Sequence, residues 1–190
     1  TLDRHETGMI EVSSSGVGFT AGGPRPYSFV EHDGSWKFSY PMGLLDTLYV
    51  VGGGHVSLAL SRVMATLPFR IVILDNRPDL ETMGTNRYAH ELRVIDFDSI
   101  GDHVEAGPRS WAVIMTFGHQ HDRRVLEGLI GKPLAYLGLM GSEAKVRRLF
   151  ADMRADNIPA EALQTVRAPI GMSIGSHTPE EIAISIAGEI

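Results

Sequence analysis

A glycine-rich turn between a predicted strand and a predicted helix is the part of this sequence best suited to hold a ligand. Residues 52–57 read Gly-Gly-Gly-His-Val-Ser, a G-x-G-x-x-S pattern whose third small position is Ser57. Glycines let the backbone approach a ligand phosphate, and the following helix offers free N–H groups at the positive end of its dipole. Asp75 stands 21 residues after Gly54, where an acid that binds a ribose hydroxyl is expected. The pattern predicts a nucleotide-type binding corner with contacts from Gly52, Gly53, Gly54, His55, Val56, Asp75 and Arg77. The plainer alternative is a tight turn whose ligand site is vestigial or serves another purpose.

A second candidate anion site begins where Gly141 and Ser142 precede a predicted helix. Ser142 is suited to cap this helix, and Lys145 adds positive charge near N–H groups that have no partner within the helix. Taken alone, the pattern also fits an ordinary capped helix with a solvated basic face. Because it follows a strand of the same predicted sheet, we expect Gly141, Ser142 and Lys145 to help bind a phosphate or pyrophosphate.

Two histidines, His119 and His121, lie beside Asp122 after another predicted strand. In an extended segment they would point to one side and form part of a metal site, whereas in a helical turn they would diverge. No third histidine has a metal-binding spacing, and no Ser-His-Asp arrangement is resolved. We therefore predict no metal site and no catalytic residue, and place Thr116 and His119 among the ligand contacts.

The C-terminal segment combines two glycines with a clear helix start. Thr178 is a suitable N-cap, Pro179 suits the first helical position, and Glu181 completes a capping box. Gly171 and Gly175 precede this helix and indicate backbone that runs close to the ligand or to a partner subunit, so both join the candidate contacts. The helix is expected to bury Ile182, Ile184 and Ile186.

The elements that position these residues alternate between strand and helix. Five short apolar runs predict strands at residues 48–51, 70–74, 92–97, 111–116 and 134–139. Such repeated units imply an α/β fold with a doubly wound, mainly parallel, Rossmann-like sheet. Ligands bind at the carboxyl ends of the strands in such a sheet, and the candidate residues follow those ends.

The first 46 residues have a different sequence pattern, in which extended segments are separated by Gly, Pro and Ser. The strand-like runs lie at residues 9–12, 17–20, 27–32 and 35–40. Residues 32–35, His-Asp-Gly-Ser, predict a hairpin turn between the last two. We interpret residues 1–46 as a short β-rich appendage, or as the remnant of a domain whose beginning is absent, ahead of a Rossmann-like domain at residues 47–190.

Composition narrows the classes of function. The 190 residues carry a formal net charge of -6 without a long basic block, which argues against nucleic acid as a partner. The absence of cysteine excludes disulfides, thiolate zinc sites and a cysteine nucleophile within this chain. No apolar run approaches the ~20 residues that span a bilayer, and no signal peptide is recognisable, so we expect a cytoplasmic protein without membrane contact.

Together these stretches resemble the C-terminal, Rossmann-like domain of the XdhC/CoxI family, the accessory factors of xanthine dehydrogenase and carbon monoxide dehydrogenase. The likeness runs from about Leu48 to Ile190. The matching residues are 52–56, 75–77, 115–122, 136–142 with Lys145, and 169–183.

The resemblance implies a maturation factor that binds molybdenum cofactor (molybdopterin) and supports its sulfuration by a partner cysteine desulfurase. Such a factor passes the cofactor to an apo molybdenum dehydrogenase, forms a homodimer, and acts as a chaperone rather than a catalyst. The family often has His directly after the Thr of the fourth-strand loop, where this chain has Phe117. The role of that histidine is therefore not carried over to this chain, and His119 is only a nearby candidate. The family's N-terminal domain is represented at most by residues 1–46, so any ligand-handling cysteine of that domain lies outside this sequence.

Two other functions use the same features. An NAD(P)-dependent oxidoreductase would bind its nucleotide at the glycine turn, but it also needs a general acid or base at a hydride-transfer site, and no convincing one is found. A pure partner-binding module would leave the fold without a ligand, which the set of Asp75, Arg77 and Lys145 argues against. The phosphate of molybdopterin, a pyrophosphate in its nucleotide forms, suits two helix N-termini at one edge of the sheet.

Overall fold

The computed structural model describes residues 8–21, 27–42 and 46–190. The chain divides into two compact units, residues 1–45 and 46–190, and this boundary lies one residue before the predicted one. No helix among the described residues is long and apolar enough to cross a membrane.

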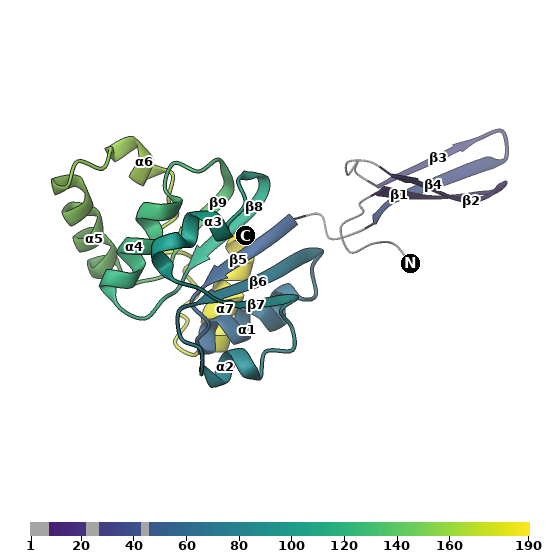
Figure 1. Ribbon diagram of the computed structural model, residues 1–190. Coiled ribbons are helices and arrows are strands. Elements are labelled where there is room, and N and C mark those ends of the chain that lie inside the picture. Colours follow the sequence, from purple (N-terminus) through teal and green to yellow (C-terminus); the bar gives the residue numbers. More distant parts are fainter. Residues whose placement is uncertain (1–7, 22–26, 43–45) are drawn as a thin grey trace. The chain divides into compact units, whose positions relative to one another are not determined.

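The first unit holds a four-stranded antiparallel sheet in the order β2-β1-β4-β3 (Figure 1). Its strands are β1 (Gly8–Ser13), β2 (Gly16–Ala21), β3 (Ser28–His32) and β4 (Ser35–Met42). The predicted hairpin joins β3 to β4, and Asp33 and Gly34 have φ angles of 48° and 74°. Positive φ at both central residues is typical of the tight turns that match the twist of paired strands. The predicted β-rich appendage is confirmed.

The second unit is built on a five-stranded parallel sheet in the order β7-β6-β5-β8-β9. The strands are β5 (Asp46–Val51), β6 (Phe69–Asp75), β7 (Glu91–Val94), β8 (Gly107–Ile114) and β9 (Leu134–Leu139). The helices are α1 (His55–Met64), α2 (Glu81–Gly84), α3 (Ile100–His103), α4 (His119–Leu129), α5 (Glu143–Ala155), α6 (Ala160–Gln164) and α7 (Pro179–Glu189), with a 3-10 turn η1 at Phe97–Ser99. The predicted Rossmann-like α/β fold is confirmed.

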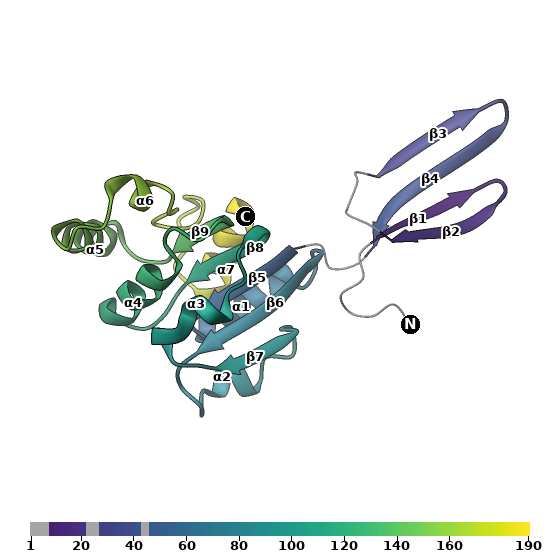
Figure 2. The same cartoon turned by 45° about the horizontal axis from the view of Figure 1, so that its top comes forward.

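Helices cover both faces of this sheet because its strands are apolar on both sides. Leu48 and Val50 of β5 pack with α1, α2 and α7 on one face, whereas Tyr49 and Val51 pack with α3, α4, α5 and α6 on the other (Figure 2). The strand order reverses between β5 and β8. The loops after these two strands therefore flank the position where ligands bind in folds of this type.

Two strand boundaries differ from the prediction. β7 ends at Val94 rather than Phe97, because the Asp96 carboxylate accepts a hydrogen bond of 3.0 Å from the N–H of Asp98 and starts η1. β8 begins earlier than predicted, at Gly107, and ends at Ile114, so Met115 and Thr116 belong to the loop at the edge of the sheet.

Helix α7 begins as predicted, with Thr178 and Glu181 forming a complete capping box. The prediction that all three isoleucines are buried is wrong for Ile184, which is 56% exposed, while Ile186 is fully buried. Residues 182 and 186 are one helical turn apart and share a face, whereas residue 184 between them points the other way.

Candidate functional site

The three glycines between β5 and α1 differ in the space around them. Gly52 has a φ of 109°, and a Cβ there would collide with the carbonyl oxygen of Met115. A Cβ on Gly53 would lie 2.6 Å from the Cγ atom of Met83. No atom lies within 4 Å of a Cβ built on Gly54. Gly52 and Gly53 are thus required by packing, while the side of the turn at Gly54 is open for a ligand.

Helix α1 starts at this turn without a cap. Gly54 is its N-cap residue, no side chain hydrogen-bonds there, and the first turn holds no acidic residue. The first backbone N–H groups of an α-helix have no partner within it, and they carry the positive end of the helix dipole. His55 is exposed, whereas the half-buried side chain of Val56 packs against the core, so Val56 offers a ligand its backbone N–H only. The arrangement favours an anion.

Asp75 follows β6 as predicted, but its carboxylate faces the protein. Its Oδ2 accepts hydrogen bonds from the Gly53 N–H at 2.6 Å and from the Arg77 guanidinium at 2.7 Å. Its Oδ1 accepts from the backbone N–H and the Nε of Arg77 at 2.9 Å and 2.8 Å. Burial opposes ionisation, yet the hydrogen bonds from Arg77 and Gly53 outweigh it and hold the pKa of Asp75 below its usual value. With 1% of the residue exposed, the predicted contact of Asp75 with a ribose is replaced by a structural role at the turn.

Arg77 connects this turn to the loop after β8. Its guanidinium carbon lies 4.6 Å from the ring centroid of Phe117, a cation–π contact. Phe117 is 56% exposed and also contacts the His121 ring, with 5.1 Å between centroids. Sequence reasoning assigned Phe117 no role. Phe117 lies in the loop after β8, beside Gly118, whose φ is 97°.

Thr116, Asp122 and the partly exposed Lys145 form a polar cluster that ties the loop after β8 to α4 and α5. Asp122 is fully buried, and its Oδ1 accepts a hydrogen bond of 2.5 Å from the Thr116 hydroxyl. The Nζ of Lys145 lies 2.6 Å from Oδ2 of Asp122. Both Thr116 and Lys145 were predicted to contact a ligand, but the structure engages them with Asp122. The positive charge of Lys145 is therefore largely neutralised within the protein.

The start of α5 matches the predicted cap. The Ser142 hydroxyl accepts a hydrogen bond of 3.3 Å from the N–H of Lys145, and a Cβ on Gly141 would lie 3.3 Å from the Cδ of Lys145. The cap occupies one N–H group and leaves those of the residues before Lys145 for a ligand.

The two histidines point apart because both lie on the helical first turn of α4. Nε2 of His119 is 3.5 Å from a carboxylate oxygen of Asp152 on α5, whereas the His121 ring packs between Phe97 and Phe117. In the described part of the chain, no three His, Cys, Asp or Glu side chains are grouped to hold a metal ion. His119 thus sits in a helix-to-helix contact, and its role toward a ligand stays a prediction.

Of the two C-terminal glycines, Gly171 makes the predicted close backbone approach, and it does so to α7 of the same chain. A Cβ on Gly171 would collide with the Ser185 hydroxyl, and the Gly171 N–H donates a 2.7 Å hydrogen bond to the Glu189 carboxylate. Gly175 has a φ of 70° and open space around it, as expected for a turn residue. Packing within the chain therefore explains Gly171, and the role of either glycine toward a ligand stays a prediction.

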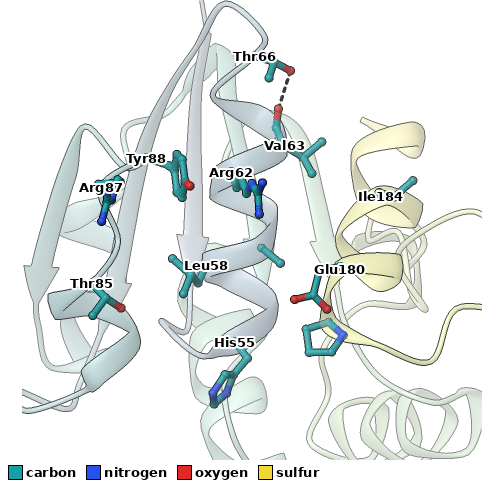
Figure 3. Close-up of a pocket in the computed structure, with 12 residues that line it drawn as sticks. His55, Leu58, Arg62, Val63, Thr66, Thr85, Arg87, Tyr88, Glu180 and Ile184 are labelled. Carbon is teal, nitrogen blue, oxygen red and sulfur yellow. Dashed lines mark hydrogen bonds between the residues drawn. The ribbon is translucent and has the colours of Figure 1, made fainter.

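A groove of about 740 Å³ runs along the outer side of α1 (Figure 3). It lies beside the glycine turn rather than over it, and of the predicted contacts it includes His55 alone. The exposed Ile184 of α7 lies on one side of it and Tyr88 on the other. The lining residues are His55, Leu58, Ala59, Arg62, Val63, Thr66, Thr85, Arg87, Tyr88, Pro179, Glu180 and Ile184.

The second unit is thus a Rossmann-like domain whose glycine turn and uncapped helix favour a phosphate-bearing ligand. Residues 48–190 match the family described as the XdhC Rossmann domain, and the chain belongs to this family. The resemblance drawn from the sequence is confirmed.

Three longer proteins are similar to this chain. It is 33% identical over 151 residues to the uncharacterized protein YqeB of Escherichia coli, covering 78% of this chain and 27% of that protein. It is 28% identical over 143 residues to a Bacillus subtilis protein named as a probable xanthine dehydrogenase subunit, covering 75% of this chain and 41% of that protein. The chain thus spans less than half the length of either relative. The crystal structure of a xanthine dehydrogenase from Bacillus halodurans superposes with a TM-score of 0.70 at 25% identity, over 96% of this chain and 58% of that one.

Proposed function

We propose that this chain is the cofactor-binding part of an accessory protein for a molybdenum-containing dehydrogenase of the xanthine dehydrogenase type. Its membership of the XdhC family supports this assignment, as do two similar proteins whose names refer to xanthine dehydrogenase. The ligand is molybdenum cofactor, whose phosphate suits the glycine turn. When bound, this group supplies the metal centre that the apo dehydrogenase receives.

The observation that carries the proposal is the open space at Gly54 beside the uncapped start of α1. A phosphate can approach the backbone there without meeting a side chain, and the N–H groups at the start of α1 donate hydrogen bonds to it. The absence of an acidic residue from the first turn of α1 leaves the positive end of the helix dipole unopposed. The residues present therefore fit the phosphate end of molybdopterin.

Phe117 fits the other end of the ligand. Arg77 lies over one face of its ring, and the ring is more than half exposed on the loop that flanks the strand-order reversal. Planar heterocycles stack on exposed aromatic rings. We assign Phe117 to stacking with the pterin, a contact that the turn alone does not provide.

The partners proposed are the apo dehydrogenase, a cysteine desulfurase that sulfurates the cofactor, and a second copy of the chain. We assign the protein to the cytoplasm and to cofactor delivery rather than catalysis. The geometry of Asp75 disfavours the alternative, an NAD(P)-dependent oxidoreductase, because the carboxylate that would bind the ribose already accepts four hydrogen bonds. A nicotinamide nucleotide bound as in other Rossmann folds would have to displace Arg77 or Gly53 from this acid.

Calorimetric titration under anaerobic conditions tests the proposal, with molybdenum cofactor, NAD and NADP as separate ligands. The wild-type protein is expected to bind molybdenum cofactor tightly and neither nicotinamide nucleotide. The Gly54→Asp variant is expected to lose cofactor binding, since it places a carboxylate where the phosphate approaches. Gly84→Asp is the matched control, because Gly84 is exposed at the end of α2 and also has no atom within 4 Å of an added Cβ.

Two results contradict the proposal. If the wild-type protein does not bind molybdenum cofactor, this cofactor is not its ligand. Binding of NAD instead would support the alternative function, an NAD(P)-dependent oxidoreductase. If Gly54→Asp and Gly84→Asp bind the cofactor equally well, the glycine turn is not the binding site. Unchanged circular dichroism of both variants ensures that lost binding does not reflect unfolding.

A further inference from the structure

The outward side of helix α1 is apolar, although it faces away from the sheet. The buried residues of α1 are Ser57, Leu60, Ser61 and Met64, so two of the four are serines. At 3.6 residues per turn, the opposite side of the helix carries residues 55, 58, 59, 62, 63 and 66. Three of these are apolar and only partly buried: Leu58, Ala59 and Val63. An apolar helix face that no other element covers marks a place where a further element packs.

The groove along this side of α1 has two different walls (Figure 3). The exposed Ile184 of α7 forms one wall together with Glu180, which lies one helical turn before it. Arg87 and Tyr88 form the other wall, and Arg62 projects from α1 on the Tyr88 side. The apolar floor of the groove thus has two cationic groups toward one edge and a carboxylate at the other.

The wall that holds Arg87 and Tyr88 is fixed to α1 by a buried side chain. Nδ2 of Asn86 donates a hydrogen bond of 3.0 Å to the Ser61 hydroxyl, and its Oδ1 accepts from the N–H groups of Tyr88 and Ala89 at 3.1 Å and 3.2 Å. On the other wall, α7 packs with α1 in one apolar cluster and begins at a complete capping box. Both walls are therefore in place before anything binds, which lowers the entropic cost of binding.

The charges of Arg62 and Arg87 are free to act on an occupant of the groove. Neither arginine forms an ion pair with a described residue, whereas Arg77 and Arg123 each bind a carboxylate. The chain as a whole has a net charge of -6, so it attracts an acidic segment only where cations of this kind gather. Charge complementarity therefore selects an occupant with carboxylates along the wall that holds Arg87.

We propose that the groove along α1 docks an α-helical segment of a partner protein, with an apolar stripe against α1 and carboxylates toward Arg62 and Arg87. From His55 to Thr66 the groove extends about 17 Å, the length of about three helical turns. Its floor and one wall are helices, whose backbone groups pair internally, so an extended segment would find no sheet edge to join. A helix satisfies its own backbone and packs its side chains between rows four residues apart. This docking does not depend on the identity of the ligand at the glycine turn.

Fluorescence anisotropy of labelled helical peptides, titrated with the full chain, tests the proposal. Two peptides share a stripe of leucines at alternating three-residue and four-residue spacing and differ only in carrying glutamate or lysine along one flank. The glutamate peptide is expected to bind about tenfold more tightly or better, and added salt should reduce the difference. A third peptide keeps the glutamate composition but scrambles the leucine spacing, and it should bind weakly because it presents no apolar stripe.

Charge reversal in the groove should reverse the preference between the first two peptides. Arg87→Glu is expected to weaken binding of the glutamate peptide by about tenfold or more and to strengthen binding of the lysine peptide. Arg148→Glu is the matched control at physiological salt, because Arg148 is exposed on α5 and does not line the groove. Ile184→Ser should also weaken binding, whereas Ile174→Ser, at a similarly exposed position outside the groove, should not.

Several results would overturn the docked helix. If the glutamate peptide does not bind, or binds no better than its scrambled form, the groove does not hold an acidic amphipathic helix. Equal effects of Arg87→Glu and Arg148→Glu would leave only long-range attraction. Binding of AMP that Arg87→Glu abolishes, without binding of any peptide, would assign the groove to a small anion. Circular dichroism shows whether each variant is folded, and Arg62→Glu, on a different element, should repeat the effect of Arg87→Glu.

Discussion

Oδ2 of Asp75 accepts a hydrogen bond of 2.6 Å from the backbone N–H of Gly53, which lies 22 residues earlier in the chain. This bond joins the ends of two adjacent parallel strands at the edge where the ligand is proposed to bind. Because the other carboxylate oxygen binds Arg77, the acid holds both the glycine turn and the arginine in place. The turn is thus preformed by a charge pair whose carboxylate is buried.

The carboxylate of Asp75 should make stability depend on acid pH. Its pKa is lower in the folded protein than in the unfolded chain, so its stabilisation is complete above the unfolded value of about 4. The stabilisation is lost as the pH falls through the lower folded pKa. We expect Asp75→Asn to lower the free energy of unfolding by about 2 kcal/mol at pH 7 and to weaken its dependence on acid pH.

Urea unfolding measured at a series of pH values checks this prediction. Asp79→Asn is the control, since Asp79 is exposed on the same loop, and it should keep the wild-type profile. Parallel profiles for Asp75→Asn and the wild type would mean that the carboxylate contributes nothing to folding.

Alanine substitutions should separate the glycine that shapes the turn from the glycine that faces the ligand. Gly52→Ala introduces a Cβ at positive φ against the Met115 carbonyl, and we expect it to cost about 3 kcal/mol or more. Gly54→Ala fits the existing backbone and space, so its effect on stability should stay within about 1 kcal/mol. Thermal denaturation of the two variants is the measurement, and equal losses would contradict the assigned difference.

Lys145 should contribute to stability through Asp122. Lys145→Met leaves a fully buried carboxylate without its ion-pair partner, which we expect to cost about 3 kcal/mol. The same change in an Asp122→Asn background should cost clearly less, because no charge is then stranded. A double-mutant cycle by urea unfolding measures the coupling.

The same variants test whether Lys145 also acts on the ligand. If Asp122→Asn with Lys145→Met binds molybdenum cofactor as tightly as Asp122→Asn alone, the second anion site does not use this lysine. A loss of affinity at preserved stability would give Lys145 a direct contact.

Phe117 should add affinity through its ring. Phe117→Ala is expected to weaken cofactor binding by about 5-fold to 150-fold, the range that corresponds to losing one stacked base. Phe117→Tyr keeps the aromatic face and should bind like the wild type, whereas Phe117→Leu keeps only the apolar volume. Calorimetry with molybdenum cofactor provides the comparison. An alanine variant with unaltered affinity would show that the ligand does not reach this loop.

The order of strands and helices could be predicted from the sequence because each buried strand is a short apolar run and each turn carries glycine or polar residues. β9 was predicted at its observed bounds for this reason. The ends of β7 and β8 were misplaced, because an apolar run does not reveal where a side chain such as Asp96 will cap the next turn. Strand existence is a local property, whereas strand ends depend on tertiary hydrogen bonds.

The candidate site could be located from spacing, but the direction of its side chains could not. The 21-residue separation places Asp75 at the right edge of the sheet, yet a sequence does not say whether its oxygens face a ligand, Gly53 or Arg77. The partnership of Lys145 with Asp122 joins residues of two different helices and leaves no periodic pattern. Phe117 was overlooked because an aromatic residue in a loop carries no motif of its own.

Helices α1 and α7 pack on the same face of the parallel sheet, and Ala183 and Ile186 of α7 complete the apolar cluster begun by Leu48 and Val50 of β5 (Figure 2). During translation, the first strands of this sheet leave the ribosome long before the helix that covers them. At a synthesis rate of ~5–20 residues per second, that face stays bare for on the order of ten seconds. The nascent chain then carries an open apolar surface, which makes it prone to aggregation until Ile186 has emerged.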